Sequence, residues 1–395
     1  AAVMRRQWET GDILIEGDDT IQTAVRYNIF NLICLGGNLD GDTSIGARGL
    51  HGESYQGHVF WDTEIYMLPF YIYQYPDAAK RLLMYRYHRL HAARKTAAGN
   101  GGRGAQFPWE SGSAGSELTP KIFVMPDGTP IRFWIGDEEV HVSADVAYGC
   151  CAYCAVTGDR DFMVQYGAEI VFEVARYWCE RAAYDRKRYE IRSVIGPDEY
   201  HLHTDNNFYT NFMAKWVLQK ASEIYRDLME QNGDALGLLC DKIGLEGEEV
   251  AQWGHVSRHM HIADTDGLIE QFDGYFDLPD HILDQYGCDG KPILPEYRDY
   301  GEYQLIKQAD VVLLMTLFPD AFTKETKKVN YEYYEKRTTH LSSLSPGTYS
   351  LAGIDAGKYD MACKYFGLSA RVDMDDNQGN AREGIHAASL GGTWQ

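Results

Sequence analysis

The sequence predicts an all-α fold, and three observations support that prediction. Apolar residues recur mostly at helical spacing, whereas the alternating patterns of strands are scarce. About a dozen helices can be drawn from these patterns, joined alternately by short and by long loops. No Pro-rich linker or charge run divides the chain, so residues 1–395 are predicted to form one domain. Paired helices connected in this way indicate a closed helical barrel whose long loops share one working face.

The predicted helices follow one another as apolar-periodic segments between polar loops. Their ranges are 20–35, 62–73, 77–98, 143–156, 161–182, a segment capped by Asn206 or Asn207 and ended by Gly233, 246–253, 304–317, 323–335, 346–356, 357–366 and 382 onward. The segment after Asn207 is the clearest of these, because Val217, Ala221 and Ile224 fall on one face.

The charge balance excludes several classes of partner. With 37 basic and 58 acidic residues the net charge is −21, which repels phosphate backbones and anionic lipid. Neither nucleic acid nor a membrane is therefore expected as a partner. The longest apolar run, 311–318, is far shorter than the roughly 20 residues that cross a bilayer, and the first residues lack a signal core. These features predict a cytoplasmic protein.

Eight cysteines are scattered through the helical patterns, which predicts reduced thiols rather than a disulfide framework. Cys151 and Cys154 form a C-x-x-C pair in the middle of a predicted helix, without a second pair to complete a zinc site. Core packing is the favoured interpretation, and no metal site is predicted. The sequence also lacks a P-loop, a dinucleotide fingerprint, H-E-x-x-H and G-x-S-x-G, so carboxylate chemistry remains.

Two loops place a tryptophan beside a carboxylate. Trp61 and Asp62 lie where a Gly-rich stretch meets an apolar helix, and Trp109 and Glu110 lie in FPWES. Asp62 alone could simply satisfy backbone donors at a helix start. A pyranose subsite, however, needs an indole that covers the sugar ring and a carboxylate that accepts from two hydroxyls. Both pairs are therefore candidate substrate-binding residues.

Polar groups also interrupt or precede helices in the second half of the chain. Lys307 and Gln308 break the apolar pattern of 304–317, and a buried ammonium needs a partner or a substrate unless it faces solvent. The hydroxyls of HLSSLSPG precede a helix that starts with proline, which makes them candidate anion ligands. The alternative is that Ser345 is an ordinary cap before Pro346, which would account for one hydroxyl but not for the other two. His386 lies near the end of the sequence, where a lone histidine is more often a core residue than a ligand.

The loop IGPDEYHLHTDNN holds two carboxylates just before the helix that Asn207 caps. Because the asparagines already satisfy the helix start, Asp198 and Glu199 need another explanation. The Gly196-Pro197 turn is expected to fix the direction of Glu199, and Asp198 is expected to support it.

These stretches resemble the inverting disaccharide phosphorylases of glycoside hydrolase family 65. The matching segments run in the family's order along nearly the whole chain and include SIGARGLHGESYQGHVFWDTE, GAQFPWESGSAGSELTP, GPDEYH, KQADVV, HLSSLSPG and EGIHAASLGGTW. The resemblance implies an (α/α)6 barrel that is normally flanked by a β-sandwich domain and a small β domain. Neither flanking domain is recognised here, and the sequence ends inside the last expected barrel helix, so we expect a fragment.

The resemblance also implies a role for each candidate residue. Glu199 matches the family's general acid. The family's glucose-binding residues are matched by Trp61, Asp62, Lys307 and Gln308. Its phosphate pocket is matched by Ser342, Ser343, His386 and, as a further candidate, His340. No cofactor is expected, inorganic phosphate is a co-substrate, and a homodimer is expected for the full-length enzyme.

The hydroxyl-rich segment favours phosphorolysis over hydrolysis. An inverting hydrolase needs a second carboxylate that activates water, whereas phosphate is already a nucleophile and needs only a pocket of hydroxyls and cations. The predicted reaction is attack of phosphate on an α-glucosyl carbon while Glu199 protonates the leaving oxygen, which gives β-glucose 1-phosphate and a free sugar. For that role the pKa of Glu199 has to rise toward roughly 6–7.

The loop GAQFPWESGSAGSELTP looks more like that of kojibiose phosphorylases than like that of maltose or trehalose phosphorylases, which makes kojibiose the favoured substrate. Two alternatives remain open. An inverting α-glucosidase of the same fold would release glucose without phosphate, and an inactive carbohydrate-binding fragment would bind sugar without turnover.

Overall fold

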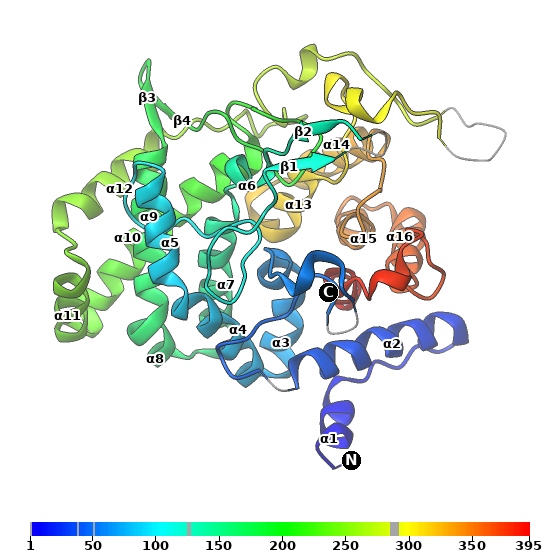
Figure 1. The fold of residues 1–395 in the computed structure, drawn as a ribbon, viewed down its shortest axis with the longest axis horizontal. Coiled ribbons are helices and arrows are strands. Elements are labelled where there is room, and N and C mark those ends of the chain that lie inside the picture. The colour runs from blue at the N-terminus through cyan, green and yellow to red at the C-terminus, as the bar shows by residue number, and fades with distance from the viewer. Residues whose placement is uncertain (1, 38, 50–51, 125–127, 285–291) are drawn as a thin grey trace.

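The computed structural model describes residues 2–37, 39–49, 52–124, 128–284 and 292–395. Over these residues helices dominate, and two short antiparallel hairpins provide the sheet structure (Figure 1). The prediction of a helical fold is therefore confirmed at this level. No helix in the described ranges is both long and apolar enough to cross a membrane.

The elements are bounded as follows. In the first half of the chain the helices are α1 (Ala2–Gly11), α2 (Asp19–Gly36), α3 (Leu68–Gln74), α4 (Pro76–His88), α5 (Leu90–Gly99), α6 (Ile135–Glu138), α7 (Val142–Thr157), α8 (Arg160–Phe162) and α9 (Ala168–Arg181). In the second half they are α10 (Phe208–Gln231), α11 (Gly233–Ile243), α12 (Gly247–His259), α13 (Asp310–Leu317), α14 (Lys324–Glu335), α15 (Ser345–Asp355), α16 (Tyr359–Ala370) and α17 (Ala387–Trp394). Strand β1 (Ile122–Val124) pairs with β2 (Pro130–Arg132), and β3 (Ala183–Asp185) pairs with β4 (Arg188–Glu190). The π-helical turns Thr63–Met67 and Met163–Gly167 lead directly into α3 and α9.

Several predicted helices have different limits in the structure. The segment 77–98 is broken at Arg89 into α4 and α5. The helix predicted over 304–317 begins only at Asp310, so Lys307 and Gln308 lie in the preceding loop and not inside a helix. The backbone of this loop bonds to distant segments, since the Lys307 N–H donates to Asp198 Oδ1 at 2.8 Å. Tertiary contacts therefore override the helical pattern here.

Other parts of the chain also differ from the prediction. Helix α11 begins at Gly233, the residue expected to stop a helix. The backbone of Asn232 is not helical, which ends α10, and α11 starts at the next residue. The segment from 382 onward is a 3-10 turn over Ala381–Glu383 followed by α17, so His386 precedes the helix. Both hairpins have strands of three residues, which are too short to show an alternating pattern.

The end of the chain packs against its beginning. Helix α17 contacts α2, α3 and the turn Thr63–Met67, and in Figure 1 the C-terminus lies beside α3. A glycine makes this approach possible, because a β-carbon on Gly391 would overlap the carbonyl group of Tyr66. The turn Thr63–Met67, which directly follows Trp61 and Asp62, is thus held by the C-terminal helix, which itself packs on α2.

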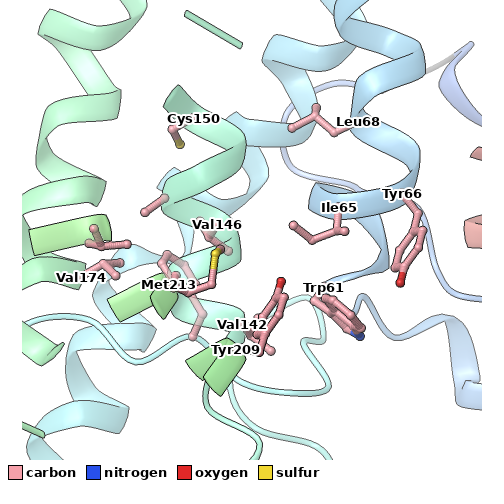
Figure 2. Close-up of a cluster of buried hydrophobic side chains, with 14 of the residues drawn as sticks. Trp61, Ile65, Tyr66, Leu68, Val142, Val146, Cys150, Val174, Tyr209 and Met213 are labelled. Carbon is pink, nitrogen blue, oxygen red and sulfur yellow. The ribbon is translucent and has the colours of Figure 1, made fainter. Parts of the chain in front are cut away.

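Trp61 belongs to the hydrophobic core. Figure 2 shows it between Tyr66 and Tyr209, near Val142 of α7. Its ring centroid lies 4.8 Å from that of His141, and only 1% of the residue is exposed. The indole therefore presents little surface to a sugar in this structure and instead supports the loop that carries Asp62.

Candidate active site

Glu199 follows the Gly196-Pro197 turn and forms an ion pair with Lys307. The Lys307 ammonium donates to Glu199 Oε1 at 2.7 Å, and about a quarter of each side chain is exposed. Burial, the largest single effect, lowers the pKa of Lys307, but the charge and hydrogen bond of Glu199, with the charges of Tyr55 and Glu139, together raise it above its ordinary value. The structure thus brings together the predicted acid and one of the predicted glucose-binding residues.

Asp198 is the buried support of this ion pair. Its Oδ2 accepts from the ring of His201 at 2.7 Å and from the amide of Gln271 at 3.0 Å, while Oδ1 accepts from the Lys307 backbone. Its own N–H donates to Asp310 at 2.6 Å. One carboxylate therefore holds the loop of Glu199 and the loop of Lys307 together, which is the supporting role expected of Asp198.

Gln308 connects the loop of Glu199 to the predicted phosphate segment. Its Nε2 donates to the Pro197 carbonyl and its Oε1 accepts from the Ser342 hydroxyl, both at 2.5 Å. Gln308 is buried, and both ends of its amide are engaged within the protein. Ser343, the next predicted phosphate contact, is partly exposed.

His340 is part of an internal network rather than a free ligand. Tyr365 donates to Glu335 at 2.7 Å, so its oxygen accepts from Nε2–H of His340 at 2.9 Å. Nδ1 then accepts from Ser345 at 2.9 Å, and burial lowers the pKa of His340 to about 3. The cap predicted at Ser345 is wrong: Leu344 takes that position, and the Ser345 hydroxyl serves His340.

His386 is fixed by a buried arginine and a carboxylate. Its Nδ1 lies 2.6 Å from Asp373 Oδ1, and its Nε2 lies 2.8 Å from a guanidinium nitrogen of Arg48. Because an arginine can only donate, Nε2 accepts and Nδ1 carries the proton toward Asp373. Arg48 is 5% exposed and was missed by the sequence analysis, although it lies within the stretch SIGARGLHG.

Tyr55 was also missed, and it lies where these groups meet. Burial and the charge of Glu199 raise the pKa of Tyr55, and Lys307, Arg48 and Asp62 also act on its hydroxyl. Its backbone is left-handed at φ 57°, which is uncommon for a non-glycine residue and is often found at functional sites. Glu199, Lys307, Asp62 and Arg48 therefore lie around the hydroxyl of Tyr55.

Asp62 is partly buried at the start of the turn that leads into α3. Burial, reinforced by the negative charges of Glu199 and Glu64, raises the pKa of Asp62 to about 7. A carboxyl with this pKa changes its protonation near neutral pH.

The raised pKa predicts a pH-dependent contribution of Asp62 to stability. The folded protein holds this proton more tightly than the unfolded chain, so the contribution is full below the ordinary value near 3.8 and is lost as pH rises through about 7. As pH rises over this range, we expect the unfolding free energy of the wild type to fall relative to that of Asp62→Asn. Urea unfolding of both proteins at about pH 5 and about pH 8 measures it. A difference independent of pH would contradict the prediction.

The loop of Trp109 and Glu110 is bonded directly to the loop of Trp61. Val59 and Ser111 exchange both backbone hydrogen bonds at 2.9 Å, and the rings of the two tryptophans lie 6.5 Å apart. The Glu117 carboxylate accepts from the backbone of Trp109 at 2.7 Å. The structure thus brings the two predicted tryptophan–carboxylate pairs together.

The cysteines take no part in this arrangement. Cys151 and Cys154 lie inside α7, as predicted, and their thiols are free like the other described ones. Cys288 lies outside the described residues. Across the described ranges, no group of three His, Cys, Asp or Glu side chains is arranged to hold a metal ion.

Residues 26–395 match the model of the glycosyl hydrolase family 65 central catalytic domain. Similar curated proteins include the kojibiose phosphorylase of Caldanaerobacter subterraneus subsp. tengcongensis, 52% identical over 98% of this chain and 51% of that protein. The kojibiose phosphorylase of Thermoanaerobacter brockii is 50% identical over 100% of this chain and 52% of that protein. A solved structure of a human-microbiome protein superposes with a TM-score of 0.88 at 34% identity, covering 99% of this chain and 51% of that one. The chain thus spans about half the length of the curated relatives it matches, and it belongs to glycosyl hydrolase family 65, whose central catalytic domain it contains.

Proposed function

We propose that this protein is an inverting disaccharide phosphorylase built on an (α/α)6 barrel. It transfers the glucosyl group of an α-linked disaccharide, kojibiose first among them, to inorganic phosphate and releases β-glucose 1-phosphate and a free sugar. The observation that carries the proposal is the buried Arg48–His386 pair facing the same region as Glu199. A fixed cation beside the proton donor is what an anionic nucleophile requires. The names of the similar curated proteins support the substrate class.

Glu199 acts as the general acid in this proposal. Its Oε1 accepts a hydrogen bond from Lys307, so the substrate must change the partners of Lys307 before Glu199 can donate a proton to it. A hydroxyl of the bound glucosyl group accepts a hydrogen bond from the Lys307 ammonium in place of Glu199. The nearby negative charge of phosphate then favours the protonated form of Glu199. Glu199 passes this proton to the leaving oxygen while phosphate forms the bond to the anomeric carbon.

The other site residues divide into contacts and supports. Arg48, Ser342 and Ser343 hold phosphate. His386 positions Arg48, because its ring nitrogens contact Asp373 and Arg48. His340 acts through Ser345, because both of its ring nitrogens are also engaged. The glucosyl group is bound by Asp62 and Lys307, with Trp61 and Gln308 positioning them from the core. The leaving sugar lies against Trp109 and Glu110.

The test is to incubate the purified protein with a panel of α-linked glucobioses, with and without phosphate. We expect β-glucose 1-phosphate only when phosphate is present, and most of it from kojibiose. Release of glucose without phosphate would instead identify an inverting α-glucosidase. Binding of a disaccharide without turnover would identify a carbohydrate-binding fragment.

Arg48→Gln is predicted to raise KM for phosphate by about 10- to 100-fold, because a charge-assisted contact to the anion is lost. KM for the disaccharide should change by less than about threefold. Initial rates over a phosphate titration measure both constants. Arg26→Gln, which removes an arginine paired with Asp12 away from the site, is the control and should leave both constants unchanged. An Arg48→Gln variant with a normal KM for phosphate would contradict the assignment.

A further inference from the structure

His58 contacts the predicted sugar-binding carboxylate Glu110 from the neighbouring loop. Its Nδ1 lies 2.7 Å from Glu110 Oε2, and the side chains are 15% and 10% exposed. Val59 and Ser111, the next residues of the two loops, exchange backbone hydrogen bonds. The side-chain contact therefore extends a backbone bridge between the loop of Trp61 and the loop of Glu110.

This geometry fixes the donor and the acceptor of the contact. An ionised carboxylate can only accept, so Nδ1 of His58 carries a proton and donates it to Oε2. The backbone of Glu110 is held as well: its N–H donates to Glu117 at 3.2 Å, and its carbonyl accepts from Leu118 at 3.0 Å. Within the described part of the chain Oε1 accepts no hydrogen bond. Glu110 thus has one oxygen held by His58 and one oxygen open.

Aromatic rings connect the loop of Glu110 to the surroundings of Glu199. The indole of Trp109 packs edge-on against Phe60 with centroids 5.7 Å apart, and Phe60 packs against Tyr55 at 5.2 Å. The charge of Glu199 in turn acts on the hydroxyl of Tyr55. Glu110 is thus connected through Trp109, Phe60 and Tyr55 to the surroundings of the proton donor. In the proposed reaction the leaving sugar lies next to that proton donor.

We infer that His58 is a positioning residue of the leaving-sugar subsite. It orients Glu110 so that Oε1 accepts a hydroxyl of the free sugar, and it thereby influences which hydroxyl faces the anomeric carbon. The inference rests on the proposed function and deepens it. His58 touches neither phosphate nor Glu199 in this role, so its loss should affect acceptor binding and linkage preference rather than donor binding.

The test uses the synthetic direction, with β-glucose 1-phosphate as donor and glucose as acceptor. His58→Ala is expected to raise KM for glucose about tenfold, the effect of one hydrogen bond to a charged group. KM for β-glucose 1-phosphate should stay within about twofold of the wild type. His58→Asn, whose Nδ2 can replace the Nδ1 donor, should restore most of the loss, which a purely structural role would not predict. The disaccharide products, separated by linkage, should shift in His58→Ala but not in His58→Asn.

Three further variants are compared with His58→Ala. Glu110→Gln should raise KM for glucose similarly, and combining it with His58→Ala should add little, since the two residues act as one unit. His88→Ala removes a surface histidine paired with Asp42 at 2.8 Å and is the matched control. An unchanged KM for glucose in His58→Ala, or equal increases for donor and acceptor, would overturn the inference. A wild type without phosphate-dependent turnover would overturn the proposed function itself.

Discussion

Glu199→Gln is expected to lower kcat for phosphorolysis by about 10²- to 10⁴-fold while the fold remains intact, because glutamine keeps the shape of the side chain but has no acidic proton. The structural cost should be small. Lys307 keeps an amide oxygen as partner, and about a quarter of each side chain is exposed, so water can solvate the ammonium. Initial rates of β-glucose 1-phosphate formation and thermal unfolding measure the two expectations.

A substrate with an activated leaving group separates proton donation from a structural role. α-Glucosyl fluoride needs little help from an acid, so its phosphorolysis by Glu199→Gln should fall much less than that of kojibiose. Asp198→Asn provides the contrast, because it disturbs the bonds to His201 and Gln271 and should lower both reactions together with stability. Near-normal turnover of kojibiose by Glu199→Gln would exclude Glu199 as the general acid.

The features predicted correctly from the sequence are those that local patterns determine. Asn207 caps α10 with its side chain accepting from the Thr210 N–H at 3.0 Å, and a polar residue before an apolar-periodic segment is enough to predict this. The two tryptophan–carboxylate pairs were recognisable because each pair is adjacent in the sequence. Their meeting in space was not, since it depends on the bridge between Val59 and Ser111.

The features that the sequence analysis missed depend on contacts between distant residues. Helix α13 is buried on nearly every side, so its apolar pattern cannot show where the helix begins, and Lys307 was placed inside it. Arg48 is identified only by its contact with His386, which is 338 residues away. The engagement of both ring nitrogens of His340 requires Tyr365 and Ser345 to come together in the fold.

Glu64→Ala is expected to cost about 3–5 kcal/mol of stability, the largest loss we predict for a single site, because it leaves a buried arginine without its counter-charge. Arg86 donates to both oxygens of Glu64, at 2.7 and 2.8 Å, and both side chains are 1% exposed. Arg86 also donates to the Phe60 carbonyl at 3.0 Å, directly before Trp61. The variant should therefore unfold more easily and also loosen the loop that carries Asp62.

The net contribution of the Glu64–Arg86 pair to stability should be far smaller than the loss caused by removing one partner alone. Replacing Glu64 and Arg86 together by methionine removes both desolvated charges, so the double variant is expected to recover much of the stability lost in Glu64→Ala. Asp375→Ala, which breaks a pair with Arg371 that is 37% exposed on both sides, is the surface control and should cost less than about 1 kcal/mol. Urea unfolding of the four proteins measures these differences. If Glu64→Ala lost no more than the surface control, water would have to reach Arg86, and the pair would not be the anchor of the Asp62 loop.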